Sequence, residues 1–275
     1  MVRRPPPVIP TPLAAARATC HAPPPRGPAT GSRSSGARGE ETMTGFEQIE
    51  SHVGEYFDRR LSRHGATAQG AAWATGESQR LRFEKLLEVV DASAPFSIND
   101  YGCGYGALAD YLEESLSSSR SFDYAGYDLS QEMVRAARER LTERGFTIVG
   151  SPAELPTADF TVASGVFNVK RDATTGDWEC LMLDTLDRMA AVSRRGFAFN
   201  CLQRPTDPSA RRPELYYTDP LAVFEHCRRR FSPKGALLAD YDLPELTVIV
   251  RTTYPPEAAS HDGTASVASS DALRA

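Results

Sequence analysis

Strand-like and helix-like segments alternate along the middle of this chain, and this alternation leaves few folds open to it. Most intervals between the strand-like segments repeat apolar residues at helical spacing, which is typical of helices laid against a parallel sheet. Two last strands, 236–241 and 246–252, are too close for a crossover helix and should pair antiparallel. The pattern predicts an α/β fold, a doubly wound sheet of about seven strands, mostly parallel with an antiparallel last strand. The five earlier strands are expected at 95–100, 123–129, 146–150, 160–167 and 196–202.

Several of the expected helices have a recognisable start. Ser130 precedes a helical repeat and is a favoured N-cap residue. Asp219 stands before Pro220, and proline is favoured in a first helical turn. Two further helices, over 46–57 and 83–90, are expected before the first strand, and a long one over 177–194.

The two ends of the chain differ in composition from its middle. Residues 1–39 hold six arginines and nine prolines but no lysine and no acidic residue, so they cannot bury enough apolar surface to order themselves. This bias ends near Met43, which is a candidate translation start. We expect a disordered leader over 1–42, one domain over 43–254 with N-terminal covering helices, and a disordered tail over 255–275.

Composition also excludes classes of function. The formal net charge is −5, from 31 basic and 36 acidic residues, and contact with duplex nucleic acid needs clustered positive charge. Apolar runs are too short to span a bilayer, and the sequence has no apolar secretory segment. The five cysteines include no CxxC pair, so no metal site is expected. We expect a cytoplasmic protein with no duplex nucleic acid and no membrane as partner.

A glycine-rich turn follows the first expected strand. The run GCGYGA at 102–107 stands between a strand and a helix, where backbone and a helix N-terminus approach a ligand closely. The run fits GxGxxA, a form of the dinucleotide-binding fingerprint, and it also fits GxGxG. Taken alone, the turn does not decide between these alternatives.

Two acidic residues at strand ends do decide. Asp100 stands two residues before Gly102, where its carboxylate would repel a dinucleotide pyrophosphate and attract a cation. Asp128 follows the second strand and is placed to accept hydrogen bonds from ribose hydroxyls. The ligand should therefore be a nucleoside that carries a positive group. S-adenosylmethionine is such a molecule, with an adenosine, a sulfonium, an α-ammonium group and no phosphate.

Several motifs together resemble the class I S-adenosylmethionine-dependent methyltransferases. They are INDYGCGYG at 98–106, AGYDLSQEMVRAA at 125–137, GSPAELP at 150–156, ADFTVASGVF at 158–167, and the closing pair of strands. The resemblance implies a Rossmann-like fold, an enzyme of the small-molecule type and S-adenosyl-L-methionine as cofactor. It also implies that the glycines line the methionine and ribose, that Asp100 serves the ammonium group and Asp128 the ribose, and that Leu129 and Met133 flank the adenine.

The resemblance also covers two further segments, which would form other walls of the cofactor site. Many family members have an acid where this chain has Ser151, so Glu154 or the backbone of Ala153 are the alternatives for adenine recognition. Upstream, the run GESQRLRF at 76–83 resembles a helix that covers the cofactor, from which Arg82 or Gln79 would reach the methionine carboxylate. The resemblance therefore implies a cofactor site of Trp73, Arg82, Asp100, Tyr101, Gly102, Cys103, Gly104, Gly106, Asp128, Leu129, Met133, Ser151, Ala153, Glu154, Ser164 and Gly165.

The acceptor side carries weaker signals. In this fold the acceptor lies beyond the fourth and fifth strands, and the chain has there neither the NPPY nor the PCQ element of DNA methyltransferases. Arg204, Arg211 and Arg212 could hold an anionic substrate, although a solvated loop is favoured. The sequence predicts methyl transfer to a small-molecule acceptor; the alternatives are a noncatalytic cofactor-binding protein and a nucleotide-dependent oxidoreductase. Candidates for catalytic residues are Asn168, Lys170, Tyr216 and Tyr217.

Overall fold

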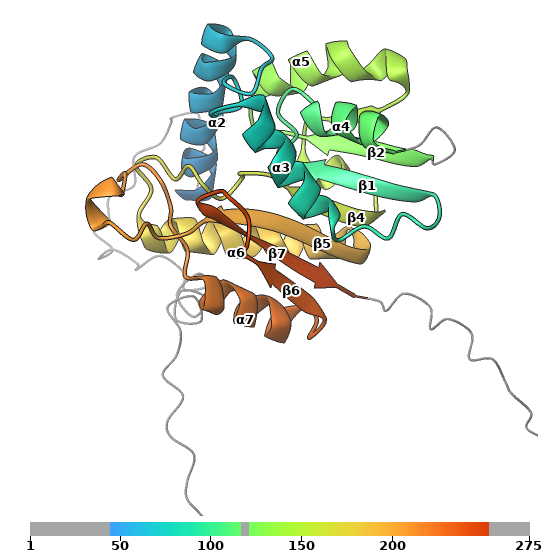
Figure 1. The fold of residues 1–275 in the computed structure, drawn as a ribbon. Helices are drawn as coiled ribbons and strands as arrows, with labels where there is room; N and C mark the ends of the chain where they lie inside the picture. The colour runs from blue at the N-terminus through green and yellow to red at the C-terminus, as the bar shows by residue number, and fades with distance from the viewer. Residues whose placement is uncertain (1–44, 117–120, 253–275) are drawn as a thin grey trace, which may run out of the picture.

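The computed structural model describes residues 45–116 and 121–252, so the predicted leader over 1–42 and tail over 255–275 lie outside the described residues. Within that part of the chain, seven strands form one sheet in the order β3-β2-β1-β4-β5-β7-β6 (Figure 1). The strands are β1 (Phe96–Tyr101), β2 (Phe122–Tyr127), β3 (Thr147–Val149), β4 (Ala158–Ala163), β5 (Ser193–Leu202), β6 (Gly235–Leu238) and β7 (Glu245–Arg251).

Strand directions confirm the predicted fold class. β1 to β5 are parallel to one another, and β7 runs antiparallel to both of its neighbours, β5 and β6. The order reverses between β1, which leads outward to β2 and β3, and β4, which leads to β5. In open α/β sheets such a switch point leaves a crevice beyond the carboxyl ends of the strands, where ligands bind.

Several strand boundaries differ from the prediction, most clearly at β4, β5 and β6. β5 begins at Ser193 rather than at 196. β4 ends at Ala163 rather than at 167, because Gly165 adopts φ +76°, a left-handed conformation that a strand cannot continue. The chain therefore turns at Ser164 and Gly165, directly after the buried end of β4. β6 ends at Leu238 rather than at 241.

The helices begin where the sequence places their caps. Ser130 accepts a hydrogen bond from the Met133 amide at the start of α5, and Asp219 caps α7 through the amides of Leu221 and Ala222. α3 begins earlier than the apolar repeat indicates, at a capping box formed by Thr75 and Ser78. The helices are α2 (Gly45–His64), α3 (Gly76–Leu87), α4 (Ala107–Ser115), α5 (Gln131–Leu141), α6 (Thr175–Ala191) and α7 (Pro220–Arg230).

Two apolar layers enclose the sheet. One core cluster joins α6 and α7 to residues such as Phe197 and Phe199, and the other joins α3, α4 and α5 to residues such as Ala198. Successive residues of β5 thus point to opposite layers, as expected for a strand that is covered on both faces. α2 contacts both α5 and α6, so it lies across one end of the sheet (Figure 1).

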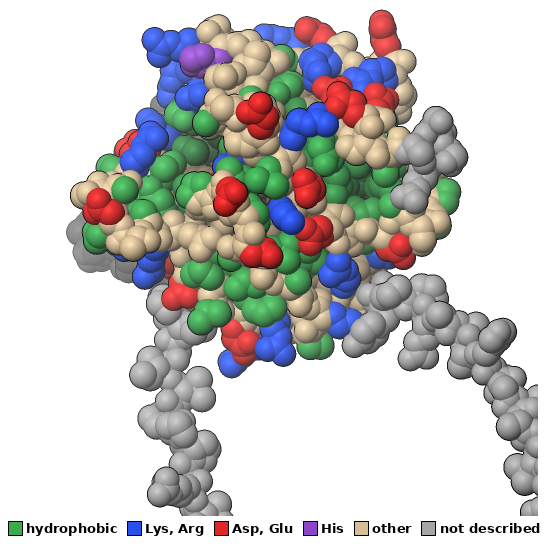
Figure 2. All heavy atoms as spheres, in the orientation of Figure 1, with side chains coloured by type: hydrophobic (Ala, Val, Ile, Leu, Met, Phe, Trp, Pro, Cys, Tyr) green, Lys and Arg blue, Asp and Glu red, His purple; other side chains and the backbone are tan. Residues whose placement is uncertain are grey.

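The charges on the surface and the lengths of the helices are relevant to which partners the protein can bind. On the face seen in Figure 2, basic and acidic side chains are interspersed. No helix among the described residues combines the length and apolar character required to cross a bilayer.

Candidate active site

The glycine turn lies close against its neighbours at the carboxyl end of β1. The amides of Gly102 and Cys103 both donate to the Tyr127 carbonyl, at 2.7 and 2.9 Å. Gly102 has φ +84°, and a Cβ there would stand 2.4 Å from Cγ2 of Val166. A side chain at this position would therefore clash with the segment after β4, which explains why glycine follows Asp100 and Tyr101 here.

Asp128 joins the turn to the end of β2. Its carboxylate accepts hydrogen bonds from the Gly104 amide at 2.7 Å and from the Ser130 amide at 2.8 Å. The side chain is buried, and burial raises the pKa of Asp128 to about 6. These bonds fix the orientation of the carboxylate at the point where the turn approaches α5.

Asp100 lies deeper, at the end of β1. It accepts a hydrogen bond from the Tyr124 hydroxyl at 2.8 Å. Burial raises the pKa of Asp100 to about 7; the Tyr124 hydrogen bond opposes this shift and the nearby Asp128 charge adds to it. No ion pair joins either carboxyl to another described side chain. Both acids are therefore buried without a directly paired cation.

A cavity of about 440 Å³ opens beside these acids. Its walls come from the glycine turn, from the segments after β2 and β4, and from α2 and α3. Most of the predicted cofactor-binding residues line it, namely Trp73, Arg82, Asp100, Tyr101, Gly102, Cys103, Gly104, Asp128, Leu129, Met133, Ser164 and Gly165.

Four predicted cofactor residues lie outside the lining. Gly106 caps α4, where a Cβ would meet Leu141 at 2.3 Å. Ser151, Ala153 and Glu154 form a short 3-10 turn after β3. The Glu154 carboxylate accepts from the amides of Gly150 and Ser151, so it stabilises its own turn.

Of the four catalytic candidates, Asn168 alone lines the cavity. Lys170 donates to the Ala173 carbonyl at 2.8 Å, and the Tyr216 hydroxyl donates to Glu179 at 3.0 Å. The Tyr217 hydroxyl accepts from the Arg212 amide at 3.1 Å. Lys170 and Tyr217 therefore hold their own segments, after β4 and after β5, while Tyr216 joins the segment after β5 to α6.

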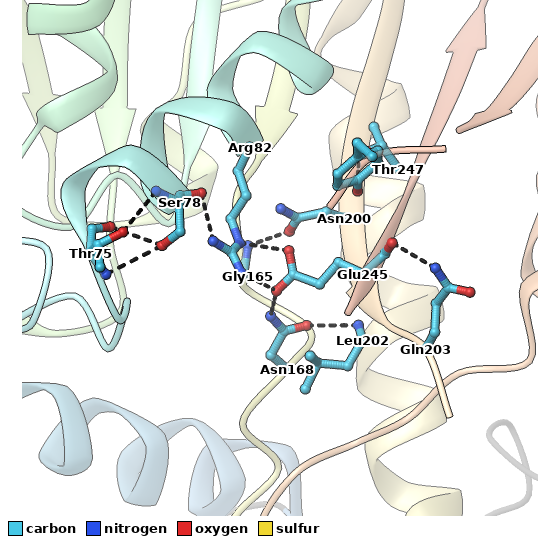
Figure 3. Close-up of polar contacts among 11 residues, drawn as sticks. Thr75, Ser78, Arg82, Gly165, Asn168, Asn200, Leu202, Gln203, Glu245 and Thr247 are labelled. Atoms are coloured by element: carbon cyan, nitrogen blue, oxygen red, sulfur yellow. Dashed lines mark hydrogen bonds and ion pairs between the residues drawn. The ribbon is translucent and has the colours of Figure 1, made fainter. Parts of the chain in front are cut away.

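A buried polar network forms one wall of the cavity. Both carboxylate oxygens of Glu245 accept hydrogen bonds from Arg82, one from Nε at 2.6 Å and the other from Nη2 at 3.2 Å (Figure 3). Glu245 also accepts a hydrogen bond from the side-chain amide of Asn168 at 2.9 Å. Asn168 in turn accepts from the Leu202 amide at 3.1 Å. The Arg82 and Glu245 side chains are 7% and 1% exposed, so this is a desolvated ion pair. It connects α3 to β7, at opposite ends of the sequence.

Trp73 closes the cavity above this pair. The Arg82 guanidinium lies 4.1 Å from the Trp73 ring centroid, a cation–π contact. On its other side, Trp73 is so close to Gly165 that an added Cβ would stand 2.4 Å from Cη2 of the indole. The Ser164 hydroxyl beside Gly165 is buried without a hydrogen-bond partner.

Sequence reasoning did not name the cavity residues of α2, and it missed Glu245. α2 presents Glu50, Val53, Tyr56, Phe57 and Arg60 to the cavity. Helical spacing predicted this helix, but the same apolar repeat is typical of any helix packed on a core. Glu245 begins an apolar strand with no motif around it; an acid at that position is the single clue that the sequence offers.

Comparison with known proteins defines the family. Residues 98–176 match a family model described as a methyltransferase domain. The chain is 48% identical over 168 residues to Rv1506c of Mycobacterium tuberculosis (strain ATCC 25618 / H37Rv), a protein named as a methyltransferase. The match covers 60% of this chain and 98% of that protein. The chain belongs to the class I S-adenosylmethionine-dependent methyltransferases. S-adenosylmethionine is therefore the cofactor of this methyltransferase.

Solved structures of low sequence identity are also similar to this methyltransferase. Magnesium protoporphyrin IX methyltransferase from Synechocystis PCC 6803 with bound S-adenosylmethionine is 13% identical, with a TM-score of 0.43, covering 78% of this chain and 87% of that chain. The [4+2]-cyclase SpnF is 16% identical, with a TM-score of 0.48, covering 70% of this chain and 75% of that chain.

Proposed function

We propose that this methyltransferase methylates a small-molecule acceptor in the cytoplasm. The observation that carries the proposal is the cavity of about 440 Å³, because the reaction takes place inside walls formed by α2, α3 and Trp73. A volume of this size is typical of sites that enclose small ligands. The mixed charges on the face in Figure 2 also favour a small molecule over duplex nucleic acid.

The residues of the cavity fit the cofactor. Two buried carboxyls without a cation suit a ligand that brings hydroxyl donors and positive charge. In this proposal Asp128 binds the ribose hydroxyls, Asp100 the ammonium group, and the main chain of Gly102 and Gly104 the methionine and ribose. The unpartnered hydroxyl of Ser164 offers a further hydrogen-bonding group on the same wall.

The other cavity residues can be assigned to the adenine and to the methionine carboxylate of the cofactor. Leu129 and Met133 would flank the adenine, as the resemblance implies. Arg82 is less suited to the methionine carboxylate, because its donors are engaged by Glu245 and by the Ser78 carbonyl at 2.6 Å. Gln79, buried and on the cavity wall, is the better group for that carboxylate.

Catalysis by this chain would depend on positioning. When bound, the cofactor supplies a methyl group on a positively charged sulfur. The chain would bind the two reactants next to each other in the cavity. Orienting two reactants in this way contributes up to about 7–11 kcal/mol. Asn168 is a neutral amide, and the Glu245 carboxylate is paired with Arg82 and accepts from Asn168, so neither is suited as a general base. We therefore expect an acceptor whose reacting atom has a free lone pair near neutral pH.

A labelling experiment tests this function. Purified protein and methyl-tritiated S-adenosylmethionine are incubated separately with a small-metabolite extract, with RNA and with protein. We expect label in the metabolites, lost in Asp128→Asn and retained in the control Asp123→Asn, an exposed carboxyl of β2. Label in RNA or protein alone would refute the small-molecule acceptor. S-adenosylhomocysteine binding with no label in any pool would identify a noncatalytic cofactor-binding protein.

A further inference from the structure

Four arginines line the cavity, and they differ in how their donors are used. They are Arg60, Arg82, Arg171 and Arg212. Arg82 donates to both carboxylate oxygens of Glu245 and to the Ser78 carbonyl, as Figure 3 shows. Arg212 is paired with Glu214, which accepts from its Nε at 2.8 Å and its Nη2 at 2.6 Å. The charges of these two arginines are therefore balanced by carboxylates of the same wall.

Arg60 and Arg171 have no carboxylate partner among the described residues. Arg60 donates through Nε and Nη2 to the Gln69 carbonyl, a neutral group, so its charge is not balanced. Arg60 and Arg171 both lie near Tyr56, with guanidinium carbons 5.8 and 5.2 Å from the ring centroid. This side of the cavity thus carries two guanidinium groups around an aromatic ring, neither of them in a direct ion pair. Glu214 feels the charge of Arg171, but its carboxylate is hydrogen-bonded to Arg212.

Arg171 is held in place while its donors stay available. Its backbone has φ +53°, an uncommon conformation for a residue with a side chain, and its amide donates to the Glu214 carbonyl at 3.0 Å. The guanidinium contacts Tyr56, and no hydrogen bond or ion pair joins it to another described side chain. A stacked guanidinium keeps its N–H donors at its edge, in a planar fork that matches carboxylate and phosphate oxygens.

We propose that Arg171 binds an oxyanion of the methyl acceptor, with Arg60 adding positive charge and Tyr56 a flat apolar contact. The acceptor is then a small anion that carries a carboxylate or a phosphate group. This inference rests on the proposed methyl transfer to a small molecule and narrows its substrate class.

The methionine carboxylate of the cofactor is the competing occupant, and the position of Arg171 argues against it. Arg171 belongs to the segment after β4, which is bridged to the segment after β5 through Val169 and Leu215. The acids and the glycine turn lie at the ends of β1 and β2 instead. The ligand crevice of such a sheet lies beyond the carboxyl ends of its strands, and Arg171 lies on the β4 and β5 side of it, away from the turn that would hold the cofactor.

The first test uses acceptors from a fractionated extract. A metabolite extract is separated on an anion exchanger before the reaction, and each fraction is assayed with methyl-tritiated cofactor. We expect label with the retained fraction, and a kcat/KM for it that falls about tenfold or more in Arg171→Gln. The matched control is Arg63→Gln, an exposed arginine of α2 outside the cavity lining, which should match the wild type. Label confined to the unretained fraction would overturn the proposal.

The second test does not depend on turnover. Protein saturated with S-adenosylhomocysteine is titrated with benzoate against benzamide, and with phenyl phosphate against phenol. We expect a preference for at least one anion, and the pair that shows it distinguishes a carboxylate from a phosphate. Arg171→Gln should remove the preference and Arg63→Gln should keep it; wild-type protein without any charge preference would overturn the proposal.

A third measurement excludes the competing occupant. S-adenosylhomocysteine affinity of Arg171→Gln should stay within about twofold of wild type. If this affinity falls about tenfold while that for 5′-methylthioadenosine, which lacks the amino acid, is unchanged, Arg171 serves the cofactor and the proposal fails. If all binding measurements agree with the proposal but no extract is labelled, the failure lies in the proposed methyl transfer.

Discussion

At the scale of single residues, ionisation of the buried Asp100 should strengthen cofactor binding and lower the stability of the ligand-free protein. The folded-state pKa of Asp100, about 7, lies above its ordinary value of 3.8, so the ligand-free folded protein holds a proton that the unfolded chain releases. Stability should then fall as pH rises from about 4 to 7. The same ionisation creates the negative charge that attracts a cationic ligand, so affinity for S-adenosylhomocysteine should rise over pH 6–7 and level off above.

Asp100→Asn separates these two effects. At pH 8 we expect the ligand-free variant to gain about 1–3 kcal/mol of unfolding free energy, because no charge has to be buried. Its affinity for S-adenosylhomocysteine should fall about tenfold or more. Urea unfolding at pH 4.5 and 8 with calorimetry checks both results, and the gain should shrink at the lower pH. A variant less stable than wild type at pH 8, with Asp123→Asn unchanged, would contradict the argument.

Gly165 is the second residue whose role can be isolated. In Gly165→Ala the new methyl would overlap Trp73, in addition to the cost of φ +76° for a residue with a side chain. We expect a loss of about 1–2 kcal/mol from the backbone and a further tenfold loss of S-adenosylhomocysteine affinity as Trp73 is displaced. Gly145→Ala is the control, because it has φ +86° with nothing within 4 Å. Equal affinities in both variants would show that the indole does not contact the ligand.

Whether the place of a residue could be predicted from the sequence depends on how far away in the sequence its contacts are. Asp100 and Asp128 were predictable because a strand end and a glycine turn fix their surroundings within a few positions. The roles of Tyr216 and Lys170 were not, because their partners come from folded loops, such as Glu179 for Tyr216. The position of the Arg171 guanidinium depends on contact with Tyr56, which is more than a hundred positions away in the sequence.

At the scale of elements, the Arg82–Glu245 pair holds α3 against β7. Glu245→Gln keeps the shape but leaves Arg82 buried without a counter-charge, so we expect a loss of about 3–5 kcal/mol in unfolding free energy. The exposed pair of Arg80 and Glu114, at 2.6 Å, provides the control. Glu114→Gln should cost less than about 1 kcal/mol because solvent screens that pair. Urea unfolding of both variants measures the difference; equal losses would mean that α3 is not held by this ion pair.

The elements themselves were largely predictable because local chemistry defines them. A cap, a proline or a glycine marks the ends of α5, α7 and β4, and these signals act within a few residues. The place of α2 was not predictable, because its apolar repeat does not distinguish a helix over a cavity from one over a core. Gly54 of α2 lies against the Leu129 backbone, a contact that depends on the whole sheet being formed.

At the scale of the whole molecule, strand order brings the functional groups together. β1 and β4 are neighbours, so the glycine turn after β1 meets the segment after β4 at Val166. β5 pairs with β7 next to β4, which brings Glu245 to the same edge as Asn168. The fold class was predictable because it follows from the alternation and the closing hairpin alone.

Ligand-linked stability tests this arrangement as a unit. A ligand at a hundred times its Kd stabilises the folded state by about 2.7 kcal/mol, which corresponds to about 5–10 °C in Tm for a domain of this size. We expect S-adenosylhomocysteine to produce such a shift and NADH to produce none, because the NADH pyrophosphate would face Asp100 and Asp128 in the same crevice. In Asp128→Asn the shift should be lost, while in Asp123→Asn it should remain. A comparable shift with NADH would mean that the buried acids do not select the ligand, and that the cationic group of the cofactor is recognised elsewhere on the molecule.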